Sequence, residues 1–584
     1  MKVNEFRTNT CGELTLNDLG KEVVVSGFVS TIRDHGGVMF LDLRDSEGIT
    51  QVVVHDEEML KGVSKETVIK VSGKVTKRDE ETINKKLPTG EVEVMCTSLE
   101  TLSKKADTLP FEIDGINEVN EEVRLKYIYL DMRSKKLSDN IKLRSEVLNF
   151  LRNKMHNLGF TEVQTPILTA SSPEGARDFV VPSRKFKGKF YALPQAPQIY
   201  KELLMVGGVD KYFQIAPCFR DEDSRKDRTL EFYQLDFEMS YVTEEDVLEI
   251  GEDIFYDVFK TFSDKEVSEK PFRRISYKEA MDSYGTDKPD LRNPLIIKDA
   301  SEVLKNTSFG PFKGSIIKNI VVDDIGTKPN SWFNEIVDFA SSIGMPGIGY
   351  ITLLEDGSLK GPIDKFLSEE ERQNLIKEFD MKTNSVMFFI ANKRLSLVRK
   401  FAGQIRDELG RKLDLMDPNK LELAIINDFP MFEYDDKTKK YEFCHNPFSL
   451  PHNGIKEYEK ENIDDILAYQ YDFVCNGNEM ASGAIRNTDL ESLTKGFEMV
   501  GYEKDVVEKR FNSLFTAFKY GVPPHGGMAP GIDRILMLIK DEPNLREVQA
   551  FPTSASGADN MMGSPSNLDE SQLEELGIQI LKED

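Results

Sequence analysis

The chain has 584 residues, of which 39% are hydrophobic and 30% charged, a composition typical of a folded globular protein rather than a disordered or membrane protein. No apolar run approaches the roughly 18 residues that span a bilayer, and the segment after Met1 lacks the apolar core of a signal peptide. The five cysteines form no C-x-x-C pair, which indicates neither a disulfide framework nor a zinc ribbon. We therefore expect a cytoplasmic protein that does not engage a membrane.

The formal net charge is −25, which argues against a general nucleic-acid binder because such proteins carry a basic surface. Residues 124–154 nevertheless hold nine lysines and arginines against three acidic residues. A positive face confined to one part of the chain is compatible with an enzyme that acts on nucleic acid, so the net charge alone does not decide the class of protein.

The first 105 residues are predicted to be all-β, with one short helix at 57–64. Five strands with a helix after the third is the order of an OB-fold, whose strand face and loops bind single-stranded oligonucleotides. Another kind of small β-barrel stays open as the alternative. The predicted strands are 23–32, 38–45, 49–55, 68–76 and 92–99.

Beyond a linker, the pattern changes to mixed helices and strands. A long amphipathic helix is predicted at 138–158, with Ser138 as its N-cap and Gly159 as its stop. Mixed α/β structure continues to about residue 286, a separable block covers 287–418, and strand-like segments resume from about residue 420. The polar, acidic end of the chain is expected to be a solvated extension.

The first segment that could carry chemistry, 159–166, directly follows this helix and ends in Pro166. A glycine stop, a strand and a proline are common structural features, and on their own they indicate only structure. The segment that follows, 172–179, is less ordinary because it combines Pro, Glu, Gly, Arg and Asp within eight residues.

The second segment is a predicted hairpin of strands 212–220 and 231–240 joined by a charged loop. Because alternate residues of a strand share a face, Gln234, Asp236 and Glu238 lie on one face and apolar residues on the other. Arg220 stands where the first strand meets the loop, and a guanidinium there can hold a phosphate with two hydrogen bonds. The alternative is a solvated charged hairpin.

The third segment is glycine-rich and runs from Gly526 to Arg534. Glycines let the backbone approach a ligand closely, and Arg534 lies near the start of a predicted helix, where anions are favoured. The sequence contains no G-x-x-x-x-G-K-[ST] phosphate loop. A glycine-rich loop alone is weak support for a nucleotide site.

In order and residue type, the three segments together resemble the signature motifs of class II aminoacyl-tRNA synthetases. Motif 1 would end at Pro166, motif 2 would hold Phe219-Arg220-Asp221-Glu222, and motif 3 would end in Gly531-Ile532-Asp533-Arg534. The N-terminal OB-fold narrows the resemblance to the aspartate, asparagine and lysine subgroup. The chain is most similar to the bacterial-type aspartyl-tRNA synthetases, on the segments 172–178, 192–198, 219–223 and 288–292 and on the insertion between motifs 2 and 3.

The resemblance implies a multidomain α+β protein that combines an OB-fold barrel, a catalytic domain built on an antiparallel sheet, and an α/β insertion domain. The helix at 138–158 would form a two-fold interface, so a homodimer is expected. The implied parts are an anticodon-binding OB-fold (1–105), a hinge (106–135), the first catalytic part (136–288), the insertion (289–418), the second catalytic part (419–560) and a C-terminal extension (561–584).

The resemblance also implies binding sites for ATP and for Mg²⁺ as cofactor. Arg220 would hold the α-phosphate, Arg534 the γ-phosphate, and Glu479 would complete the catalytic set. These roles agree with reactions that need charge neutralisation and positioning more than covalent catalysis. Asp472 and Glu479 would hold the metal. The residues expected at ATP are Arg220, Asp221, Glu222, Glu479, Gly531, Ile532, Asp533 and Arg534.

The implied amino acid is L-aspartate. Lys201 and Arg486 would meet its side-chain carboxylate, which suits an anion, whereas asparagine would make a buried Lys–Arg pair costly. Lysine would require acidic residues there instead. The full set expected around aspartate is Glu174, Gln198, Lys201, Arg220, Asp236, His445 and Arg486.

In one loop the chain departs from the family pattern. The family typically has His-His-Pro-Phe there, and this chain has His445-Asn446-Pro447-Phe448. Asn446 can still donate a hydrogen bond, although the role of the second histidine no longer follows from the resemblance.

The tRNA anticodon would be read on the OB-fold, where Phe40 would stack on a base. His35 carries a further expectation, because family members that charge both tRNA(Asp) and tRNA(Asn) often have histidine in this loop, and strict members often have leucine. A turn histidine chosen only for its backbone conformation is the alternative. The expected anticodon residues are Arg33, His35, Phe40, Gln51 and Glu93.

The leading interpretation is thus an aspartate–tRNA ligase that consumes ATP and charges tRNA(Asp), with tRNA(Asn) as a suspected second substrate. Two alternatives are weighed against it. A sister asparaginyl or lysyl synthetase is disfavoured by Lys201, Arg486 and the insertion. A catalytically silent tRNA-binding paralogue is disfavoured because Arg220, Arg534 and Glu479 are all present.

Overall fold

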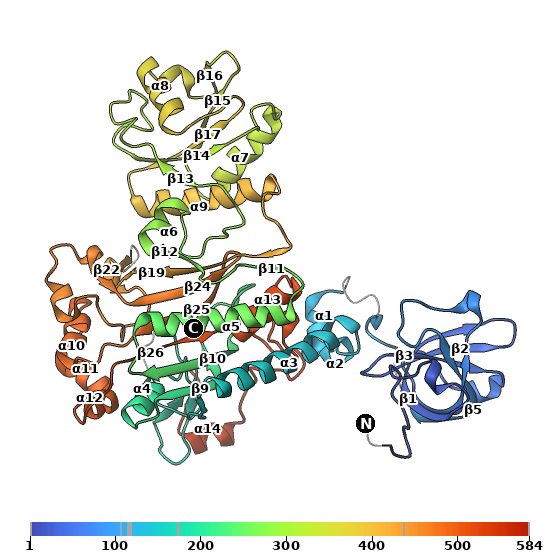
Figure 1. Ribbon diagram of the computed structural model, residues 1–584. Helices are drawn as coiled ribbons and strands as arrows, with labels where there is room; N and C mark the ends of the chain where they lie inside the picture. Colours follow the sequence, from blue (N-terminus) through green and yellow to red (C-terminus); the bar gives the residue numbers. More distant parts are fainter. Residues whose placement is uncertain (1–2, 105–107, 114–118, 172–175, 436–437, 582–584) are drawn as a thin grey trace. The chain divides into compact units, whose positions relative to one another are not determined.

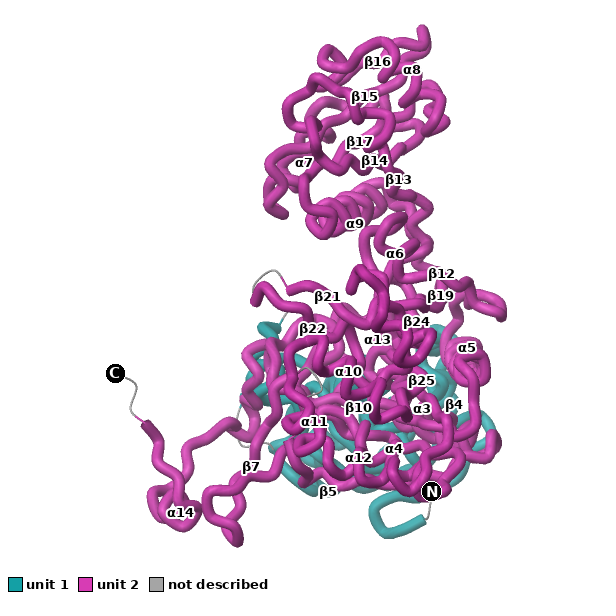
Figure 2. Tube along the Cα trace, turned by 90° about the vertical axis from the view of Figure 1, so that its left-hand side faces the viewer, with its two compact units in different colours: residues 1–139 teal, residues 140–584 magenta. Residues whose placement is uncertain are grey.

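The computed structural model describes residues 3–104, 108–113, 119–171, 176–435 and 438–581. The chain divides into two compact units, residues 1–139 and 140–584, which Figure 2 shows in different colours. Within the described ranges, no helix is both long enough and apolar enough to cross a bilayer.

The first unit is built around a closed five-stranded barrel with the strand order β1-β2-β3-β5-β4, so the predicted OB-fold is confirmed. Inward-facing valines and leucines, such as Val25, Leu41 and Val71, fill the barrel and are fully buried. The predicted helix is the shorter 3-10 helix Glu57–Leu60. The strands are β1 (Glu22–Asp34), β2 (Met39–Arg44), β3 (Ile49–Val54), β4 (Val68–Lys77) and β5 (Val92–Ser103).

Within the predicted hinge, the described residues form two short helices, α1 (Glu121–Lys126) and α2 (Ile128–Asp131). Arg124 pairs with the buried Asp131 at 3.0 Å. Arg133 pairs with Glu66 of the barrel unit at 3.0 Å and lies 4.1 Å from the centre of the Phe28 ring. These contacts pack this part of the segment against other residues of the first unit.

The long helix α3 spans Lys135–Asn157 and begins three residues earlier than predicted. The hydroxyl of Ser134, not that of Ser138, accepts a hydrogen bond from a backbone N–H of the first turn, that of Leu137, at 3.3 Å. Either serine satisfies the capping pattern, so the sequence alone could not choose between them.

An eight-stranded sheet forms the centre of the second unit, with the order β12-β19-β24-β25-β26-β10-β9-β6. The predicted hairpin is its β9–β10 pair, in which Asp236 lies opposite Gln214. Neighbouring strands are antiparallel except at the two edges. The strands are β6 (Thr161–Glu162), β9 (Lys211–Phe219), β10 (Glu231–Ser240), β12 (Arg273–Ser276), β19 (Leu423–Asn427), β24 (Gln470–Cys475), β25 (Asn478–Ile485) and β26 (His525–Pro530).

The two faces of this sheet have opposite chemistry. Leu235 and Phe237 of β10 point into the main hydrophobic core, where they meet α3, α5 (Glu244–Phe262) and α13 (Ile532–Lys540) (Figure 1). Asp236 and Glu238 point the other way, toward the opposite face. The period-2 alternation of the strand thus separates a packed face from a charged face, as the sequence predicts.

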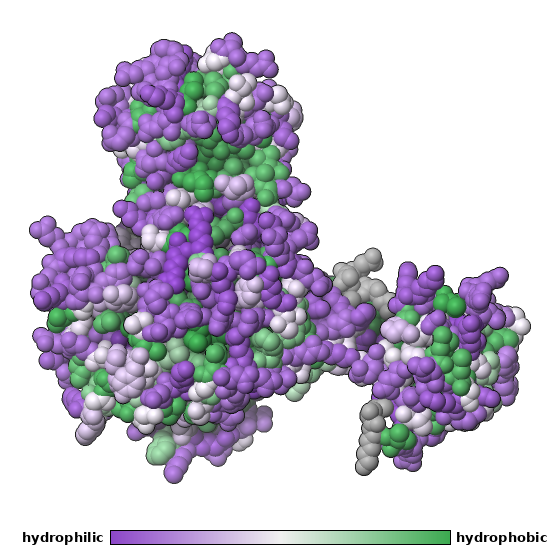
Figure 3. Space-filling view, viewed as in Figure 1, coloured by the Kyte–Doolittle hydropathy of each residue, from purple (hydrophilic) through white to green (hydrophobic). Residues whose placement is uncertain are grey.

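The insertion contains a second, five-stranded sheet with the order β13-β14-β17-β15-β16 and separate hydrophobic clusters of its own. Figure 3 shows a mainly hydrophilic surface, with apolar atoms visible near α7. The elements are β13 (Ile297–Asp299), β14 (Ile316–Val322), β15 (Gly349–Leu353), β16 (Leu359–Lys360), β17 (Val386–Asn392), α7 (Asn330–Ser342), α8 (Glu369–Glu378) and α9 (Leu395–Lys412).

Helix α9 holds the segment that leads from the sheet into the insertion. The buried guanidinium of Arg406 donates to the backbone carbonyls of Asp290, Asn293 and Leu295 at 2.6–2.9 Å. At Gly403 an added Cβ would lie only 2.7 Å from the carbonyl oxygen of Gly285, so the backbones meet directly. The segment that leads from the sheet into the insertion is therefore held rigidly.

The remaining elements surround the open face of the eight-stranded sheet or complete small pairs of strands. Residues 570–576 of the predicted C-terminal extension form a short helix, α14, in which Leu576 is buried. These elements are α4 (Gln198–Val206), α6 (Tyr277–Ser283), α10 (Leu490–Met499), α11 (Lys504–Arg510), α12 (Asn512–Phe518), α14 (Glu570–Leu576), β7 (Val180–Pro182), β8 (Phe190–Ala192), β11 (Glu266–Val267), β18 (Lys420–Leu421), β20 (Phe429–Pro430), β21 (Phe432–Asp435), β22 (Lys440–Phe443) and β23 (Leu467–Ala468).

Candidate active site

A cavity of about 630 Å³ lies on the charged face of the eight-stranded sheet. Strands β10, β25 and β26 and helix α4 contribute to its lining, together with the loop that follows β9 and the loop that follows β22. Residues of the second and third sequence segments, Ala176 of the segment 172–179 and the His445 loop therefore meet in one place. The predicted residues that line it are Gln198, Lys201, Arg220, Glu222, Asp236, His445, Glu479, Arg486, Gly531, Asp533 and Arg534.

Three of the predicted residues that the structure describes do not line the cavity. Ile532 is fully buried in the hydrophobic core, and Asp472 is buried behind the cavity wall on β24. Asp221 exchanges backbone and side-chain hydrogen bonds with Arg177 at its edge. Glu174 lies outside the described residues. Asp533 lines the cavity, but its carboxylate pairs with Arg144 of α3.

One end of the cavity holds a compact cluster of buried charges. The Lys201 ammonium lies 2.7 Å from Asp236 Oδ1 and 3.2 Å from Glu238 Oε2. The guanidinium of Arg486 grips the same Glu238 with two hydrogen bonds of 2.8 and 3.1 Å. All four side chains are at most 3% exposed. Opposite charges at such distances compensate each other for the loss of hydration.

The pKa values in this cluster follow from that compensation. Burial would raise the pKa of the Glu238 carboxyl, but Arg486 and Lys201 outweigh burial and lower it to about 2. Burial would lower the pKa of the Lys201 ammonium, and Asp236 and Glu238 raise it above its ordinary value instead. Glu238 and Lys201 therefore both stay charged at neutral pH.

Two atoms of this cluster have unused hydrogen-bonding capacity. Among the described residues, neither Arg486 Nη1 nor Asp236 Oδ2 has a partner, although both are buried. A buried polar atom without a partner is costly, so each is suited to a ligand. The free guanidinium N–H would donate to a carboxylate, and the free carboxylate oxygen would accept from an ammonium. The arrangement can bind an amino acid with an acidic side chain.

The other end of the cavity is rich in cations suited to phosphates. Arg534, in the first turn of α13, lies 3.4 Å from the carboxylate of Glu479 and also bonds to its backbone carbonyl. Arg220 lies over the ring of Phe232, with 5.0 Å between the guanidinium carbon and the ring centre. Glu222 pairs with Arg228 at 2.6 Å. Guanidinium groups held in this way can neutralise the charge of a triphosphate.

The predicted metal ligands lie at the side of this end. Asp472 is fully buried, and burial together with the neighbouring charges of Glu479 and Asp287 raises its pKa to about 7, against the opposing effect of His445. Arg534 and Lys288 outweigh the effect of burial on Glu479 and lower its pKa. Carboxylate oxygens that repel each other in a dry site fit a hard divalent cation such as Mg²⁺.

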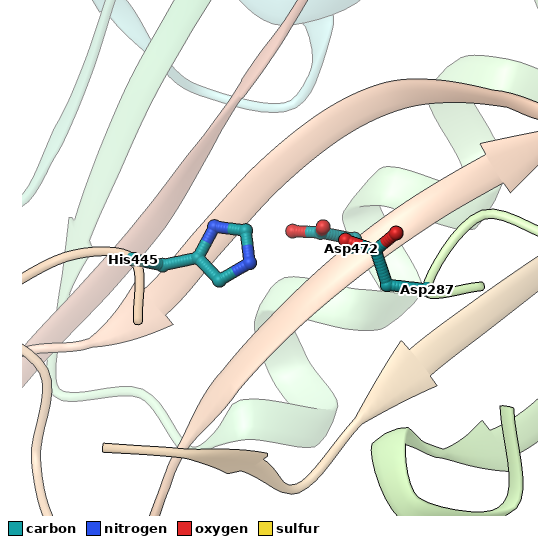
Figure 4. A group of neighbouring side chains, drawn as sticks. All are labelled: Asp287, His445 and Asp472. Atoms are coloured by element: carbon teal, nitrogen blue, oxygen red, sulfur yellow. The ribbon is translucent and has the colours of Figure 1, made fainter. Parts of the chain in front are cut away.

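A second grouping shares Asp472. One donor atom each from Asp287, His445 and Asp472 lies within 4.8 Å of the others (Figure 4). The His445 ring also meets the edge of Phe429, with ring centres 4.7 Å apart. Mg²⁺ prefers oxygen ligands, so Asp287 is the member that adds to the carboxylates, and His445 lies beside them.

Several residues of the cavity were not predicted as site residues from the sequence. Asp287 was noted only as the opening of the separable block, and Lys288 only as part of a segment that carries the resemblance, yet both line the cavity because α9 holds the segment in place. Phe232, Gln470 and Ser482 also line it. Glu238 was assigned to the polar face of its strand, and that alternation was the available signal for its role.

The predicted anticodon residues lie together on the barrel of the first unit. Arg33 bonds to Asp42 at 2.7 Å and to Gln51 at 3.2 Å, and Gln51 donates to Glu93 at 2.8 Å. The rings of His35 and Phe40 meet edge to face, with centres 5.5 Å apart. The strand face thus presents an aromatic pair beside a polar network, which is the arrangement that binds unstacked bases.

Comparisons with known proteins extend over both units. Residues 120–555 match the family model of class II tRNA synthetases (D, K and N), and residues 23–102 match the OB-fold nucleic acid binding domain. Proteins named aspartate–tRNA(Asp/Asn) ligase from Wolbachia sp. subsp. Drosophila simulans and from Ehrlichia canis are 48% and 49% identical to the chain, covering 99% of it and 100% of their own length.

Solved structures share the fold at lower identity. The asparaginyl-tRNA synthetase of Pyrococcus horikoshii in complex with asparaginyl-adenylate has a TM-score of 0.57 and 20% identity, and covers 93% of this chain and 97% of its own. The aspartyl-tRNA synthetase of Entamoeba histolytica has a TM-score of 0.55 and 19% identity, covering 93% of this chain and 90% of its own.

The charge cluster generates a prediction on stability. Glu238→Gln removes the anion shared by two buried cations, and we expect it to lower the free energy of unfolding at pH 7 by about 3 kcal/mol. The Glu238 pKa of about 2 lies below the ordinary 4.5, so its stabilisation is complete above pH 4.5 and is lost as the pH falls toward 2. Urea unfolding at pH 7, 4 and 3 should show that the free energies of unfolding of the wild type and E238Q converge as the pH falls.

Glu244→Gln is the matched control because it should change the free energy of unfolding in the opposite direction. Burial, with Asp428 and Glu245 nearby, raises the Glu244 pKa to about 7 from 4.5, and its Oε1 is buried without a partner among the described residues. Ionised Glu244 therefore costs stability above pH 7, and the cost vanishes below pH 4.5. We expect E244Q to be more stable at pH 8 and equal at pH 4. Destabilisation at pH 8 by E244Q, or no effect of E238Q, would contradict this account.

Proposed function

The chain belongs to the family of class II tRNA synthetases that comprises the D, K and N enzymes, and from this premise we propose that it is an aspartate–tRNA ligase. Members of the family join an amino acid to tRNA with ATP. The observation that carries the choice of aspartate is the buried Arg486, which is tied to Glu238 on one side and has a free N–H on the other.

The charge balance of the cavity favours aspartate over the other two amino acids of the subgroup. Lys201 and Arg486 are held by two carboxylates, and the free donor of Arg486 would pair with a third, that of the substrate. Asparagine brings no negative charge to this donor, and the ammonium of lysine would be repelled by it. Asp236 Oδ2 would accept from the α-ammonium.

In the first step, an oxygen of the aspartate α-carboxylate would attack the α-phosphorus of ATP, and the bond to pyrophosphate would break. Arg220 would stabilise the charge on the α-phosphate, and Arg534 would hold the γ-phosphate. Asp472 and Glu479 would hold Mg²⁺, which supplies charge neutralisation to the phosphates. In the second step, the 3′-hydroxyl of the terminal adenosine of tRNA would attack the activated carbonyl and release AMP.

The alternative of a catalytically silent paralogue that only binds tRNA has less support than the ligase. Arg220, Glu479 and Arg534 line one cavity together with Lys201 and Arg486, so both ends needed for adenylate formation are present in the same space. A protein that only binds tRNA has no need for five such charges around one cavity. We place the reaction in the cytoplasm, in keeping with five cysteines that form no disulfide among the described residues.

The barrel supports tRNA(Asn) as a second substrate beside tRNA(Asp). Relatives at 48–49% identity bear names that include both tRNAs. His35 lies against Phe40, the proposed stacking residue, so a change at position 35 would act directly on a base bound there. Charged tRNA(Asn) that carries aspartate would need a subsequent amidation.

Aminoacylation with labelled aspartate on purified tRNA(Asp) and tRNA(Asn) transcripts tests this function. We expect both to be charged, and His35→Leu to lower kcat/KM for tRNA(Asn) at least about tenfold relative to tRNA(Asp), as loss of a base contact costs 1–3 kcal/mol. Charging of neither tRNA would refute the ligase. An unchanged ratio in H35L would refute the role of His35 and leave the ligase intact.

We also propose a homodimer formed through α3. A shallow groove of about 590 Å³ runs beside this helix and is lined by Phe150, Leu158 and Phe262 among polar residues. Apolar side chains along a helix at the surface favour a protein partner. Sedimentation equilibrium at micromolar concentration should give twice the chain mass of 66.5 kDa, whereas the mass of a single chain would contradict the proposal.

A further inference from the structure

A chain of hydrogen bonds links Gln198 of the cavity to Glu202 and His525, two residues to which no role has been given so far. His525 Nδ1 lies 2.8 Å from the carbonyl oxygen of Pro523, and Nε2 lies 3.4 Å from Glu202 Oε2. The other oxygen of Glu202 accepts from the Gln198 amide at 2.7 Å. Neither His525 nor Glu202 has any exposed side-chain surface.

Donor and acceptor chemistry fixes the direction of every link. A carbonyl oxygen can only accept, so His525 Nδ1 carries a proton. Nε2 faces a carboxylate, so a second proton lies between the imidazole and Glu202. Burial disfavours the imidazolium, but Glu202 and then Glu238 outweigh burial and raise the pKa of His525. A carboxylate that receives the Nε2–H of His525 can only accept hydrogen bonds.

These hydrogen bonds affect the cavity because they set the orientation of the Gln198 amide. Because Glu202 only accepts, the Gln198 NH₂ group must face Glu202, and its Oε1 is turned away from Glu202. Asn446 donates to that Oε1 at 3.2 Å, while the Asn446 oxygen is itself occupied by the backbone N–H of Phe448 at 2.8 Å. Oε1 has a second lone pair, and Gln198 lines the cavity. If the Gln198 amide could flip, it would present its NH₂ donor to the cavity instead of its oxygen.

We propose that His525 and Glu202 are positioning residues that fix the Gln198 amide with its oxygen toward the α-ammonium of the amino acid. Gln198 Oε1 and the free Oδ2 of Asp236 then form a two-acceptor site for the ammonium. The proposal rests on the proposed function, since it concerns the same amino acid. It also gives Asn446 a role, because its NH₂ group holds the Gln198 oxygen from the other side.

The variants Glu202→Gln and His525→Gln test the proposal in the full-length protein. Gln at position 202 can donate as well as accept, so it no longer fixes the orientation of the Gln198 amide. Gln at position 525 replaces the cation that faces Glu202 with a neutral amide. His452→Gln is the matched control, because His452 also lies 3.4 Å from a carboxylate, that of Asp428, but neither residue lines the cavity.

The readouts are KM for aspartate, KM for ATP and kcat in ATP–pyrophosphate exchange, and the inhibition constant of succinate, which has both carboxylates of aspartate but no ammonium. We expect KM for aspartate to rise about tenfold or more in E202Q and H525Q, in line with a bond to a charged group. KM for ATP and the inhibition constant of succinate should stay within about twofold of the wild-type values, and H452Q should match the wild type.

An unchanged KM for aspartate in E202Q would overturn the proposal. So would a parallel rise of KM for aspartate and of the succinate inhibition constant, because a loosened cavity would weaken both ligands. E202Q serves as the deciding variant if H525Q fails to fold, since it changes one atom and leaves the shape of the side chain intact. Absence of aspartate-dependent exchange in the wild-type protein would instead refute the proposed function, so the two failures are distinguishable.

Discussion

The need to compensate buried charge governs the proposed active site. Lys201, Asp236, Glu238 and Arg486 are removed from water almost completely, and each would be strongly destabilising alone. They are tolerated because each contacts an opposite charge at hydrogen-bonding distance. The compensation leaves one guanidinium N–H and one carboxylate oxygen without partners among the described residues. We propose that selectivity for an acidic amino acid follows from these two atoms, because the N–H would pair with a carboxylate of the ligand and the oxygen with its ammonium.

The sheet makes such a cluster possible by separating its two faces. On β10, Leu235 and Phe237 pack against helices in the main hydrophobic core, while Asp236 and Glu238 occupy the other face. The core holds the strands rigid, so the charged groups opposite it need little reorganisation when a ligand binds. The insertion adds to this rigidity because Arg406 of α9 holds the segment that carries Asp287 and Lys288 into the cavity.

Local patterns predicted a large part of this arrangement. Alternation in residues 231–240 placed Asp236 and Glu238 on one face, and the five strands of the barrel followed from turn signals between short apolar runs. These features depend on residues close in sequence. The start of α3 was misplaced by three residues because Ser134 and Ser138 both satisfy a capping pattern.

What the sequence could not predict depends on contacts between distant parts of the chain. Glu238 meets Arg486 across 248 positions, and Glu202 meets His525 across 323. No local period or spacing links such pairs. The raised pKa of Asp472 is likewise invisible in the sequence, because it results from complete burial beside Glu479 and Asp287, which come from separate strands and loops. The roles of the predicted site residues stay predictions until they are tested by substitution.

The central claim, that the charged end of the cavity selects an acidic amino acid, is tested most directly without tRNA. ATP–pyrophosphate exchange by the full-length protein would be measured with aspartate, asparagine and lysine in parallel at saturating ATP and Mg²⁺. The account predicts exchange with aspartate, with kcat/KM more than about a hundredfold above that for the other two, because each of them leaves the free donor of Arg486 without an anion. Exchange with asparagine or lysine that equals or exceeds exchange with aspartate would contradict it.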